Sequence, residues 1–426
     1  MIHIDGQLYD RASIQDLGNR MSSQLGLDTD VKRRYALCFG STIEWLSLFF
    51  AIRKSGASVL PIHPSTPYSA ARRLAETAQC ERLIYRNYPE EKLIPSESPS
   101  STGQLLQMSS GTTGAAKCIA RDWTEIDCEV ETYVKTFREP DTMTPVIACP
   151  TTHSYGLICG ILVALARGQV PTLVDTGNPK HLLAILRDTE RPLLYSSPAI
   201  LHTLSRLLPE DEKLYATMTS GTLLPEPWFA RIRDKSQHMF QQYGCSETGC
   251  IAINPDVRAS DEMGFVLPHH AAITGNSRET ASEIIIQSRD GRAINTRDLG
   301  YQRADGMLVF MSRMDDMINV SGLNVYPKDV EDTVMAMATI RDAVAFRKSD
   351  QFAGERVVLL YSASQSVPPK NIRDWCSNHL ASHQLPSDLV QVEEIPRQAN
   401  GKINRRDIAA QYEAGKLIKR STGATL

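Results

Sequence analysis

Short apolar runs alternate with helix-like segments from the N-terminus to about Asn276, and this alternation constrains the fold more than any other feature. "RYALCFG" (34–40) and "SVLPI" (58–62) are typical of buried strands, and "TIEWLSLFFAIRKSG" (42–56) between them has a helical pattern. Further strand-like runs are "PVIACP", "VPTLVD" and "PLLYSS", again separated by helical segments. Such alternation favours parallel sheets covered by helices.

The pattern changes after Asn276. "ASEIIIQSRDGRAI" and "YQRADGMLVFMSR" each place strand-like segments on both sides of an Asp-Gly pair, which is typical of antiparallel hairpins. Beyond Asp315, a helix that starts near Pro327 is followed by further strands and another helix. We therefore predict an α/β fold. Its large N-terminal domain (1–313) has parallel sheets covered by helices and a small β-barrel-like part, and a small mobile α+β domain (314–426) follows.

Composition narrows the environment and the partners. The formal net charge of −3 gives no strong attraction to nucleic acid or to an anionic membrane, so we expect neither as a partner. The longest apolar stretch, "GLICGILVALARG" (156–168), is too short to cross a bilayer and is predicted to be a buried helix. The N-terminus lacks a secretory pattern, and nine scattered cysteines are typical of free thiols. We predict a cytoplasmic protein without a membrane span.

The stretch "SSGTTGAAK" (Ser109–Lys117) has the composition of a phosphate-binding loop. Consecutive amides of a glycine-rich turn form a concave anion site, and hydroxyls and a lysine add donors. The spacing is not that of the Walker motif, in which a hydroxyl residue follows Gly-Lys. For an isolated Ser/Gly-rich stretch, a flexible surface loop would be the better interpretation.

Four further segments follow this loop in order. They are "QQYGCSETG" (Gln241–Gly249), "NTRDLGY" (Asn295–Tyr301), "SRMDDMINVSGLNVYPKDVE" (Ser312–Glu331) and "PRQANGKINR" (Pro396–Arg405). Together the five motifs resemble those of the adenylate-forming superfamily, which comprises acyl- and aryl-CoA synthetases, peptide-synthetase adenylation domains and luciferases. The pattern is most similar to that of the acyl- and aryl-CoA synthetases.

The resemblance implies an ATP-dependent acid–thiol ligase. Such an enzyme joins a carboxylic acid to AMP with release of pyrophosphate, and then transfers the acyl group to the thiol of CoA or of a carrier-protein phosphopantetheine. ATP and Mg²⁺ are the implied cofactors, and an acyl carrier protein is a possible partner. A phosphotransferase that releases ADP would use the same glycine-rich loop, but nothing besides the loop supports it.

By resemblance, nucleotide binding falls to Ser109, Ser110, Gly111, Thr112, Thr113, Gly114, Lys117, Gly221, Thr222, Leu223, Tyr243, Gly244, Cys245, Ser246, Asp298 and Arg313. The loop and its lysine would surround the β- and γ-phosphates, and Tyr243 would stack on adenine. Asp298 would accept both ribose hydroxyls with assistance from Arg313. Glu247 would help hold Mg²⁺, a role suited to a hard oxygen ligand.

The match is not complete at every position. Arg297 and Ser312 stand where the family usually has glycine, and Ser246 replaces a threonine. Ala116 and Cys118 depart from the usual residues of the glycine-rich loop. We expect ribose and phosphate binding to survive, because the residues that make the bonds are present.

The resemblance implies two functions for the C-terminal segment. Lys402 would be the catalytic lysine, stabilising negative charge between the attacking carboxylate and the α-phosphate. Asp315 would be the hinge about which the small domain swings between two poses, and Gly322 would border the tunnel for the pantetheine arm in the second pose. Without this context, Lys402 would be interpreted as an exposed loop lysine.

The nature of the acid depends on "CPTTHSYGL" (Cys149–Leu157). His153 would lie near the substrate carboxylate, although a packed loop histidine is an equal alternative. Amino-acid adenylation domains usually carry an aspartate close to here, and the segment has no acidic residue, so a substrate ammonium would lack a partner. We therefore predict a simple aryl or acyl acid, with a preference for aromatic acids. The alternatives are an amino-acid-adenylating enzyme that loads a carrier protein and a catalytically silent nucleotide-binding homologue.

We predict that Lys402→Ala nearly abolishes adenylate formation but spares thioester formation from supplied acyl-adenylate. The lysine would act on the charge that develops in the first step only. The two half-reactions are measured separately, and an equal loss of both would contradict the assigned role.

Overall fold

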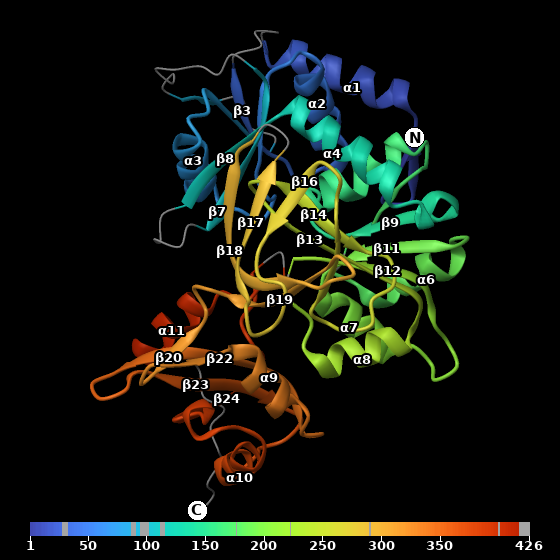
Figure 1. Ribbon diagram of the computed structural model, residues 1–426. Coiled ribbons are helices and arrows are strands. Elements are labelled where there is room, and N and C mark those ends of the chain that lie inside the picture. The colour runs from blue at the N-terminus through green and yellow to red at the C-terminus, as the bar shows by residue number, and fades with distance from the viewer. Residues whose placement is uncertain are drawn as a thin grey trace, which may run out of the picture.

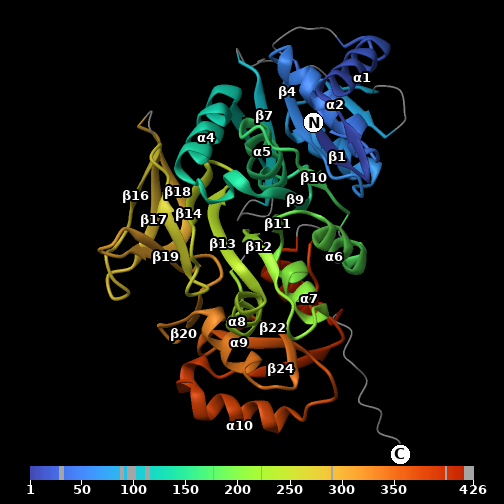
Figure 2. The ribbon, with the colours of Figure 1, turned by 90° about the vertical axis from the view of Figure 1, so that its right-hand side faces the viewer.

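The structure is a computed structural model, which describes residues 1–27, 33–86, 91–93, 102–110, 116–175, 177–221, 223–288, 291–398 and 401–416. Figure 1 shows a large upper part that contains the N-terminus and a smaller lower part built from the orange and red end of the chain. The side view in Figure 2 shows the same two parts one above the other. The fold is α/β, as the sequence predicted.

One sheet of the upper part has a parallel centre. Its strands run in the order β6 (Glu91–Lys92), β5 (Arg82–Tyr85), β3 (Arg34–Cys38), β4 (Ser58–Pro61), β7 (Gln104–Ser110) and β8 (Ala116–Asp122). Neighbours from β5 to β7 are parallel, whereas β6 and β8 pair antiparallel at the edges. The strands predicted at 34–40 and 58–62 are β3 and β4, and the helix predicted between them is α2 (Thr42–Lys54). Helix α2 begins where the Ser41 hydroxyl accepts a hydrogen bond from the Glu44 amide.

A second sheet joins parallel and antiparallel strands edge to edge. Its order is β16 (His270–Ile273), β17 (Ser282–Ser288), β18 (Ala293–Gln302), β19 (Met307–Arg313), β15 (Glu262–Val266), β14 (Gly249–Asn254), β13 (Ser236–Cys245), β12 (Leu214–Thr219), β11 (Pro192–Ser196), β9 (Thr144–Ala148), β10 (Thr172–Leu173), β1 (Ile2–Ile4) and β2 (Gln7–Tyr9). Neighbours from β13 to β1 are parallel. Their crossovers include α6 (Pro179–Asp188), α7 (Pro198–Leu207) and α8 (Glu226–Asp234).

The antiparallel half of this sheet contains the hairpins predicted from the two Asp-Gly pairs. Strand β18 pairs antiparallel with both β17 and β19. The predicted β-barrel-like part corresponds to β14–β19, and it is hydrogen-bonded to β13 through β14, so it continues the parallel sheet. This pairing covers the edge of β13 that the parallel strands would otherwise leave open.

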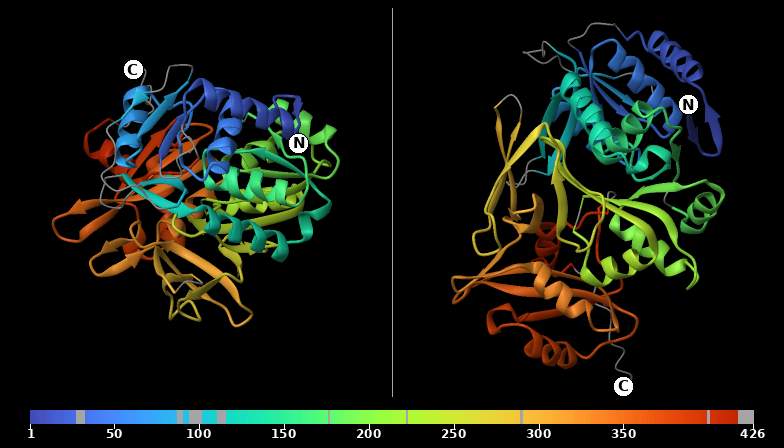
Figure 3. Two further views of the ribbon diagram at one scale, coloured as in Figure 1. Left: turned by 90° about the horizontal axis from the view of Figure 1, so that it is seen from above. Right: turned by 45° about the vertical axis from the view of Figure 1, so that its right-hand side comes forward.

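Helices fill the space between the two sheets, as the two views in Figure 3 show. They are α1 (Arg11–Gln24), α2, α4 (Trp123–Thr136), a π-helix (Tyr155–Leu162) and α5 (Val163–Ala166). One apolar cluster contains residues of both sheets and of these helices, among them Leu37, Phe49, Ile126, Ile158 and Phe240. Helix α3 (Tyr68–Thr77) packs with Ala71 and Ala75 in a separate cluster on the first sheet. The upper part is therefore layered, as an alternating sequence predicts.

The buried helix predicted at 156–168 is present, but its first turns are a π-helix. Two glycines allow its close packing: a Cβ on Gly156 would lie 2.5 Å from the Pro150 carbonyl oxygen, and one on Gly160 would lie 3.0 Å from Ile147. The Tyr155 hydroxyl donates to the Met218 carbonyl (2.6 Å) and so anchors the start of the helix to β12. Short π-helical segments are rare and are frequent near functional sites.

The lower part is a mixed sheet with helices. Its strands are β21 (Leu323–Val325), β20 (Ile318–Val320), β23 (Gly354–Ala363), β22 (Ile340–Asp350) and β24 (Asp388–Val392), of which only β24 runs parallel to its neighbour among the described pairings. The helices are α9 (Pro327–Met335), α10 (Pro369–His379) and α11 (Arg405–Glu413), and short 3-10 helices span Glu139–Thr142 and Ser382–Gln384. Strand β19 ends at Arg313 and β20 begins at Ile318. The predicted boundary between 313 and 314 falls at the start of this connection.

No helix in the described ranges has the length and apolar character needed to cross a membrane.

A buried ion pair connects the two sheets through α4. Arg121 on β8 donates to Glu129 on α4 (Nη2–Oε2, 2.7 Å), and their side chains are 5% and 1% exposed. The other carboxylate oxygen of Glu129 accepts the backbone N–H of Cys250 at the start of β14 (2.8 Å). A Cβ on Gly249 would lie 2.2 Å from this carboxylate, so only glycine fits there. The pair therefore fixes the turn that carries the "SETG" motif.

We predict that Glu129→Ala lowers the free energy of unfolding by about 3–5 kcal/mol, because it leaves the Arg121 charge buried without its partner. On the same helix, Glu131 pairs with Lys135, but these side chains are 69% and 75% exposed. Glu131→Ala is the matched control and should cost less than about 1 kcal/mol. Urea unfolding followed by circular dichroism compares the two variants. Equal losses would contradict the structural role of the buried pair.

Candidate functional site

The glycine-rich loop closes the hairpin between β7 and β8. Ser109 pairs with Lys117 and Ser110 with Ala116, so the loop begins and ends within one ladder. Lys117 is exposed at the start of β8. The remaining predicted residues here, Gly111, Thr112, Thr113 and Gly114, lie outside the described residues, as does Thr222. Their predicted nucleotide contacts stay predictions.

The "GCSETG" motif forms the turn between β13 and β14. A Cβ on Gly244 would lie 2.2 Å from the Gly249 carbonyl oxygen, so glycine permits the close approach of the two strands. Ser246 and Glu247 are half-buried in the turn itself. Burial raises the pKa of the Cys245 thiol to about 11, which keeps it protonated near neutral pH. The turn therefore offers a carboxylate and a hydroxyl rather than a thiolate.

Asp298 lies at the centre of a buried polar group. It faces Arg313 directly across β18 and β19, and Arg313 Nη1 donates to its Oδ1 (2.9 Å). The Tyr243 hydroxyl donates to the other oxygen, Oδ2 (2.5 Å). Burial raises the pKa of Asp298, and the two donors oppose that rise. Leu223 packs against the apolar cluster that contains Tyr243. The structure thus brings four of the predicted nucleotide-binding residues together.

The departure at Arg297 has a conformational cost. Its φ of +63° lies in the left-handed region, which explains why glycine suits the position. A non-glycine residue in this conformation costs on the order of 1 kcal/mol. The Arg297 amide donates to Glu283 Oε1 (2.9 Å), which helps to hold the turn before Asp298. Asp298 keeps its partners, so the substitution leaves the polar group intact.

Lys402 of the lower part reaches the upper part at Gly221. A Cβ on Gly221 would lie 3.4 Å from Lys402 Cε, and Gly221 has a φ of +92°. The neighbouring Gly401 approaches Ser197, since a Cβ there would lie 3.2 Å from Ser197 Cβ. Lys402 is exposed, but the surrounding protein partly desolvates its ammonium group. Desolvation lowers its pKa, the charge of Arg313 lowers it further, and Asp298 opposes both.

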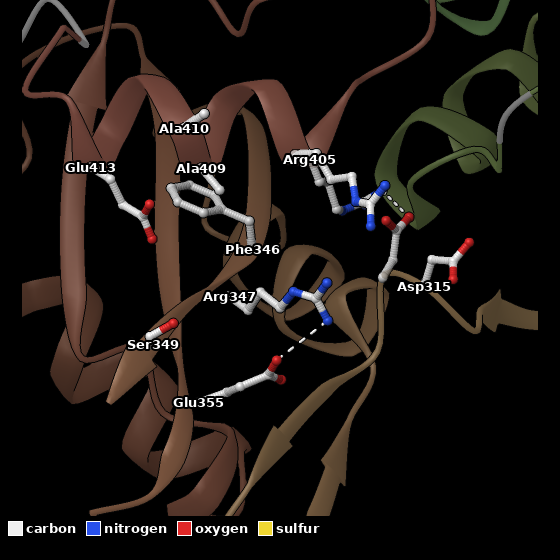
Figure 4. A pocket seen from close by; sticks show the side chains of 11 residues that line it. Asp315, Phe346, Arg347, Ser349, Glu355, Arg405, Ala409, Ala410 and Glu413 are labelled. Atoms are coloured by element: carbon white, nitrogen blue, oxygen red, sulfur yellow. Dashed lines mark hydrogen bonds and ion pairs between the residues drawn. The ribbon is translucent and has the colours of Figure 1, made fainter. Parts of the chain in front are cut away.

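The predicted hinge lies between two arginines. Asp315 Oδ2 is 3.8 Å from Arg313 Nη2, and the next residue, Asp316, accepts from Arg405 Nη1 (3.1 Å). Arg405 also holds both carboxylate oxygens of Glu331 on α9 (2.8 and 3.0 Å). Figure 4 shows Arg405 and Asp315 at the same end of a pocket of about 260 Å³. The connection is therefore tied to the upper part on one side and to α11 on the other.

Gly322 lies away from Lys402, at the two-residue turn between β20 and β21. Ser321 and Gly322 have φ values of 53° and 86°, the left-handed pair that a tight hairpin of this length needs. The Gly322 amide donates to Asn319 Oδ1 (2.9 Å). A Cβ on Gly322 would meet no described atom within 4 Å. Its predicted place beside a pantetheine arm therefore belongs to a second pose and stays a prediction.

His153 stands directly before the π-helix. Desolvation lowers its pKa to about 4, with further contributions from the positive charges of Lys402 and His63, so the imidazole is neutral at pH 7. His63 follows β4, and its Nδ1 accepts the Ser65 amide (3.2 Å). Burial also lowers the pKa of His63. The structure therefore places a second histidine close enough to His153 to affect its pKa.

Sequence reasoning missed His63, Glu129 and Ser197. His63 comes after the carboxyl end of a parallel strand, the edge at which α/β proteins collect functional residues, and that position was a usable signal. Glu129 lies among the apolar residues on the buried face of α4, and a charged residue at such a position was a second usable signal. The approach of Ser197 to Gly401 joins distant segments and had no local signal.

Family models match both parts of the chain. The model described as AMP-binding enzyme matches residues 92–279, and the model of the AMP-binding enzyme C-terminal domain matches residues 329–402. The 3,4-dihydroxybenzoate–aryl-carrier protein ligase of Bacillus anthracis is 38% identical over 374 residues, which cover 88% of this chain and 90% of the relative.

Solved structures share the fold at lower identity. ATP-bound MatB from Rhodopseudomonas palustris superposes with a TM-score of 0.83 at 17% identity and covers 97% of this chain and 96% of its own. The o-succinylbenzoate CoA synthetase MenE from Bacillus subtilis, in complex with its acyl-adenylate intermediate, has a TM-score of 0.80 at 18% identity. That match covers 96% of this chain and 94% of the neighbour. These likenesses establish the arrangement of the two parts as a known fold.

We predict that Tyr243→Phe moves the acid limb of the pH profile of ATP use to higher pH. The Tyr243 hydroxyl bond lowers the pKa of Asp298, so its removal lets burial raise that pKa further. A carboxylate that must be ionised to accept hydroxyls is lost as pH falls through its pKa, and the loss would then begin at a higher pH. The measurement is kcat/KM for ATP against pH. Tyr301→Phe, on the strand β18 that carries Asp298, is the control. Coincident profiles for both variants and the wild type would contradict this account.

Proposed function

This chain belongs to the AMP-binding enzyme family and is an ATP-dependent acid–thiol ligase, and we propose that it activates a dihydroxylated benzoate for an aryl carrier protein. The substrate and acceptor are those in the name of the Bacillus anthracis ligase, which is similar over most of both chains.

The approach of Lys402 to Gly221 is the observation that carries the proposal. It places an ammonium group of the lower part beside the polar group formed by Asp298 and Arg313 in the upper part. Adenylation needs positive charge where a carboxylate meets a phosphate, because two anions must come together. The pose therefore suits the first half-reaction.

In that half-reaction, an oxygen of the substrate carboxylate attacks the α-phosphorus of ATP. The new P–O bond forms as the bond to the β-phosphate oxygen breaks, and pyrophosphate leaves with the electron pair. Lys402 would stabilise the charge on the attacking carboxylate and the α-phosphate, and Asp298 would accept the ribose hydroxyls. The carrier thiolate then attacks the acyl carbonyl carbon, and AMP leaves.

Glu247 fits the requirement for a magnesium ligand. Its half-buried carboxylate lies in the turn next to Cys245, whose raised pKa keeps the thiol out of competition. The described residues hold no group of three or more His, Cys, Asp or Glu side chains suited to a metal ion. Mg²⁺ commonly binds through one or two carboxylates together with substrate phosphates, so one carboxylate is enough. When bound, the ion would neutralise phosphate charge.

The acid pocket favours a neutral ring over an amino acid. The charges that act on His153 come from Lys402 and His63, which are both bases. A substrate ammonium would meet repulsion here rather than a carboxylate partner. His63, whose Nδ1 accepts the Ser65 amide, would present its Nε2–H as a donor, which suits a hydroxyl group on an aromatic ring.

The second half-reaction would require the small domain of residues 314–426 to turn about Asp315. The connection before β20 is short, and the turn that carries Gly322 projects from the sheet of the lower part. Rotation would withdraw Lys402 and bring that turn toward the acyl-adenylate, where a residue without a side chain leaves room for a pantetheine arm. Closure of this kind at a hinge is common in enzymes with two parts.

We also infer a cytoplasmic location. All nine cysteines are free thiols. Thiols persist in reducing compartments, where a carrier thiol also stays reactive.

We predict ATP–pyrophosphate exchange with 3,4-dihydroxybenzoate that exceeds exchange with benzoate by at least about tenfold, because an unmade bond to a buried polar group costs about 1–3 kcal/mol. The panel includes 2,3-dihydroxybenzoate, 2-succinylbenzoate, aliphatic acids and α-amino acids. Acid loaded onto a phosphopantetheinylated aryl carrier protein is compared with acid transferred to CoA.

The comparison of acids and the comparison of acceptors can each refute one part of the proposal. Exchange that prefers an amino acid or an aliphatic acid would refute the dihydroxybenzoate proposal. Transfer to CoA with no loading of the carrier would refute the proposed acceptor while leaving the acid unchanged.

A further inference from the structure

Two of the described contacts between the two parts involve Trp228 of α8. Its indole is 6% exposed and stacks on the His202 ring of α7, with ring centroids 4.4 Å apart and an angle of 4° between planes. The guanidinium carbon of Arg397, from the segment that leads to Lys402, lies 5.1 Å from the Trp228 ring centroid. A cation over an indole face is attracted to it, and burial strengthens the attraction.

The same guanidinium holds the segment that carries Lys402. Arg397 Nη1 donates to the Gly401 carbonyl (3.2 Å), and Nη2 donates to Asp342 Oδ2 on β22 (2.6 Å). The backbone amide of Gln398 donates to the Lys402 carbonyl (2.9 Å), which closes the loop onto itself. Arg397 therefore joins the Trp228 ring, the body of the lower part and the residue before Lys402.

Further bonds surround this contact. Trp228 Nε1 donates to the Arg341 carbonyl (3.3 Å), and the Glu226 amide at the start of α8 donates to Asp332 of α9 (2.9 Å). Figure 2 shows α8 lying over α9 and β22. These contacts all join residues that precede the predicted hinge at Asp315 to residues that follow it.

We propose that Arg397 is a positioning residue for adenylation, which acts through its stack on Trp228 to hold Lys402 against Gly221. The inference rests on the proposed function. The bond from Arg397 to Asp342 lies within the lower part and would survive a rotation about the hinge, whereas the stack on Trp228 would break. The stack therefore favours the first half-reaction only. Its effect on the rate of that half-reaction needs both Trp228 and Arg397.

The test measures both half-reactions in the full-length protein: pyrophosphate exchange with the preferred acid, and thioester formation from supplied aryl-adenylate. Trp228→Leu and Arg397→Met should each lower kcat for exchange roughly 3- to 30-fold, the range that a cation–π contact supports. KM for the acid and the rate of thioester formation should stay unchanged. Trp228→Phe keeps an aromatic face and should restore most of the exchange rate.

Two controls separate positioning from stability. Arg373→Ala removes an exposed cation from α10 and should leave both half-reactions unchanged. In the Trp228→Leu/Arg397→Met double variant, the loss in exchange should be smaller than the product of the two single losses, because the contact between the two side chains is already absent in each single variant. If Arg397→Met does not fold, Trp228→Leu against Trp228→Phe still gives the comparison.

An equal loss of both half-reactions, or a double variant whose losses multiply, would overturn the positioning role. Undiminished exchange in Trp228→Leu would overturn it as well. Wild-type protein that shows no exchange with any acid would refute the proposed function instead, so the two failures are distinguishable.

Discussion

The ion pair between Asp298 and Arg313 is the interaction on which the candidate site depends. The Asp298 side chain is nearly buried, and burying a carboxylate costs several kcal/mol unless partners compensate. Arg313 and the Tyr243 hydroxyl supply that compensation from β19 and β13. Because Arg313 is the last residue of β19, the pair also fixes the point at which the chain leaves the upper part. One contact thus fixes both the buried polar group of the candidate site and the start of the connection between the two parts.

The charges of this ion pair in the upper part also act on Lys402 in the lower part. Arg313 lowers the pKa of Lys402, whereas Asp298 opposes that effect, so the lysine responds to both members of the pair. His153 in turn responds to Lys402 and stays neutral. A site that must accept several phosphate charges gains from cations that are placed before the substrate arrives, since little reorganisation is then needed. The cations here come from segments far apart in the sequence.

Much of this fold was predictable because its signals are local. Strands β3 and β4 with α2 between them, and the hairpins at the Asp-Gly pairs, each follow from the periodicity or turn chemistry of a short segment. The nucleotide-binding residues came from ordered motifs, and the structure brings Tyr243, Asp298 and Arg313 together. Their roles as ligands of a nucleotide stay predictions.

The rest could not be predicted, because it depends on contacts between distant segments. No local pattern shows that β14 pairs with β13 and so joins the antiparallel strands to the parallel sheet. The π-helical start of the helix at Tyr155 depends on how its glycines pack against neighbouring segments. The unusual backbone at Arg297 shows the same limit, since the sequence reveals the missing glycine but not the positive φ.

Arg397 and Arg405 lie on either side of Lys402 in the sequence, and each holds the lysine segment through different contacts. Arg405 binds Asp316 and Glu331, and Arg397 binds Asp342, so both anchor the lysine segment within the lower part. Only Arg397 also contacts the upper part through an aromatic ring. A planar guanidinium with several donors can make such contacts at once, which an ammonium cannot. The contacts within the lower part would therefore hold the segment in both of the proposed poses, whereas its contact with Trp228 would be made in only one of them.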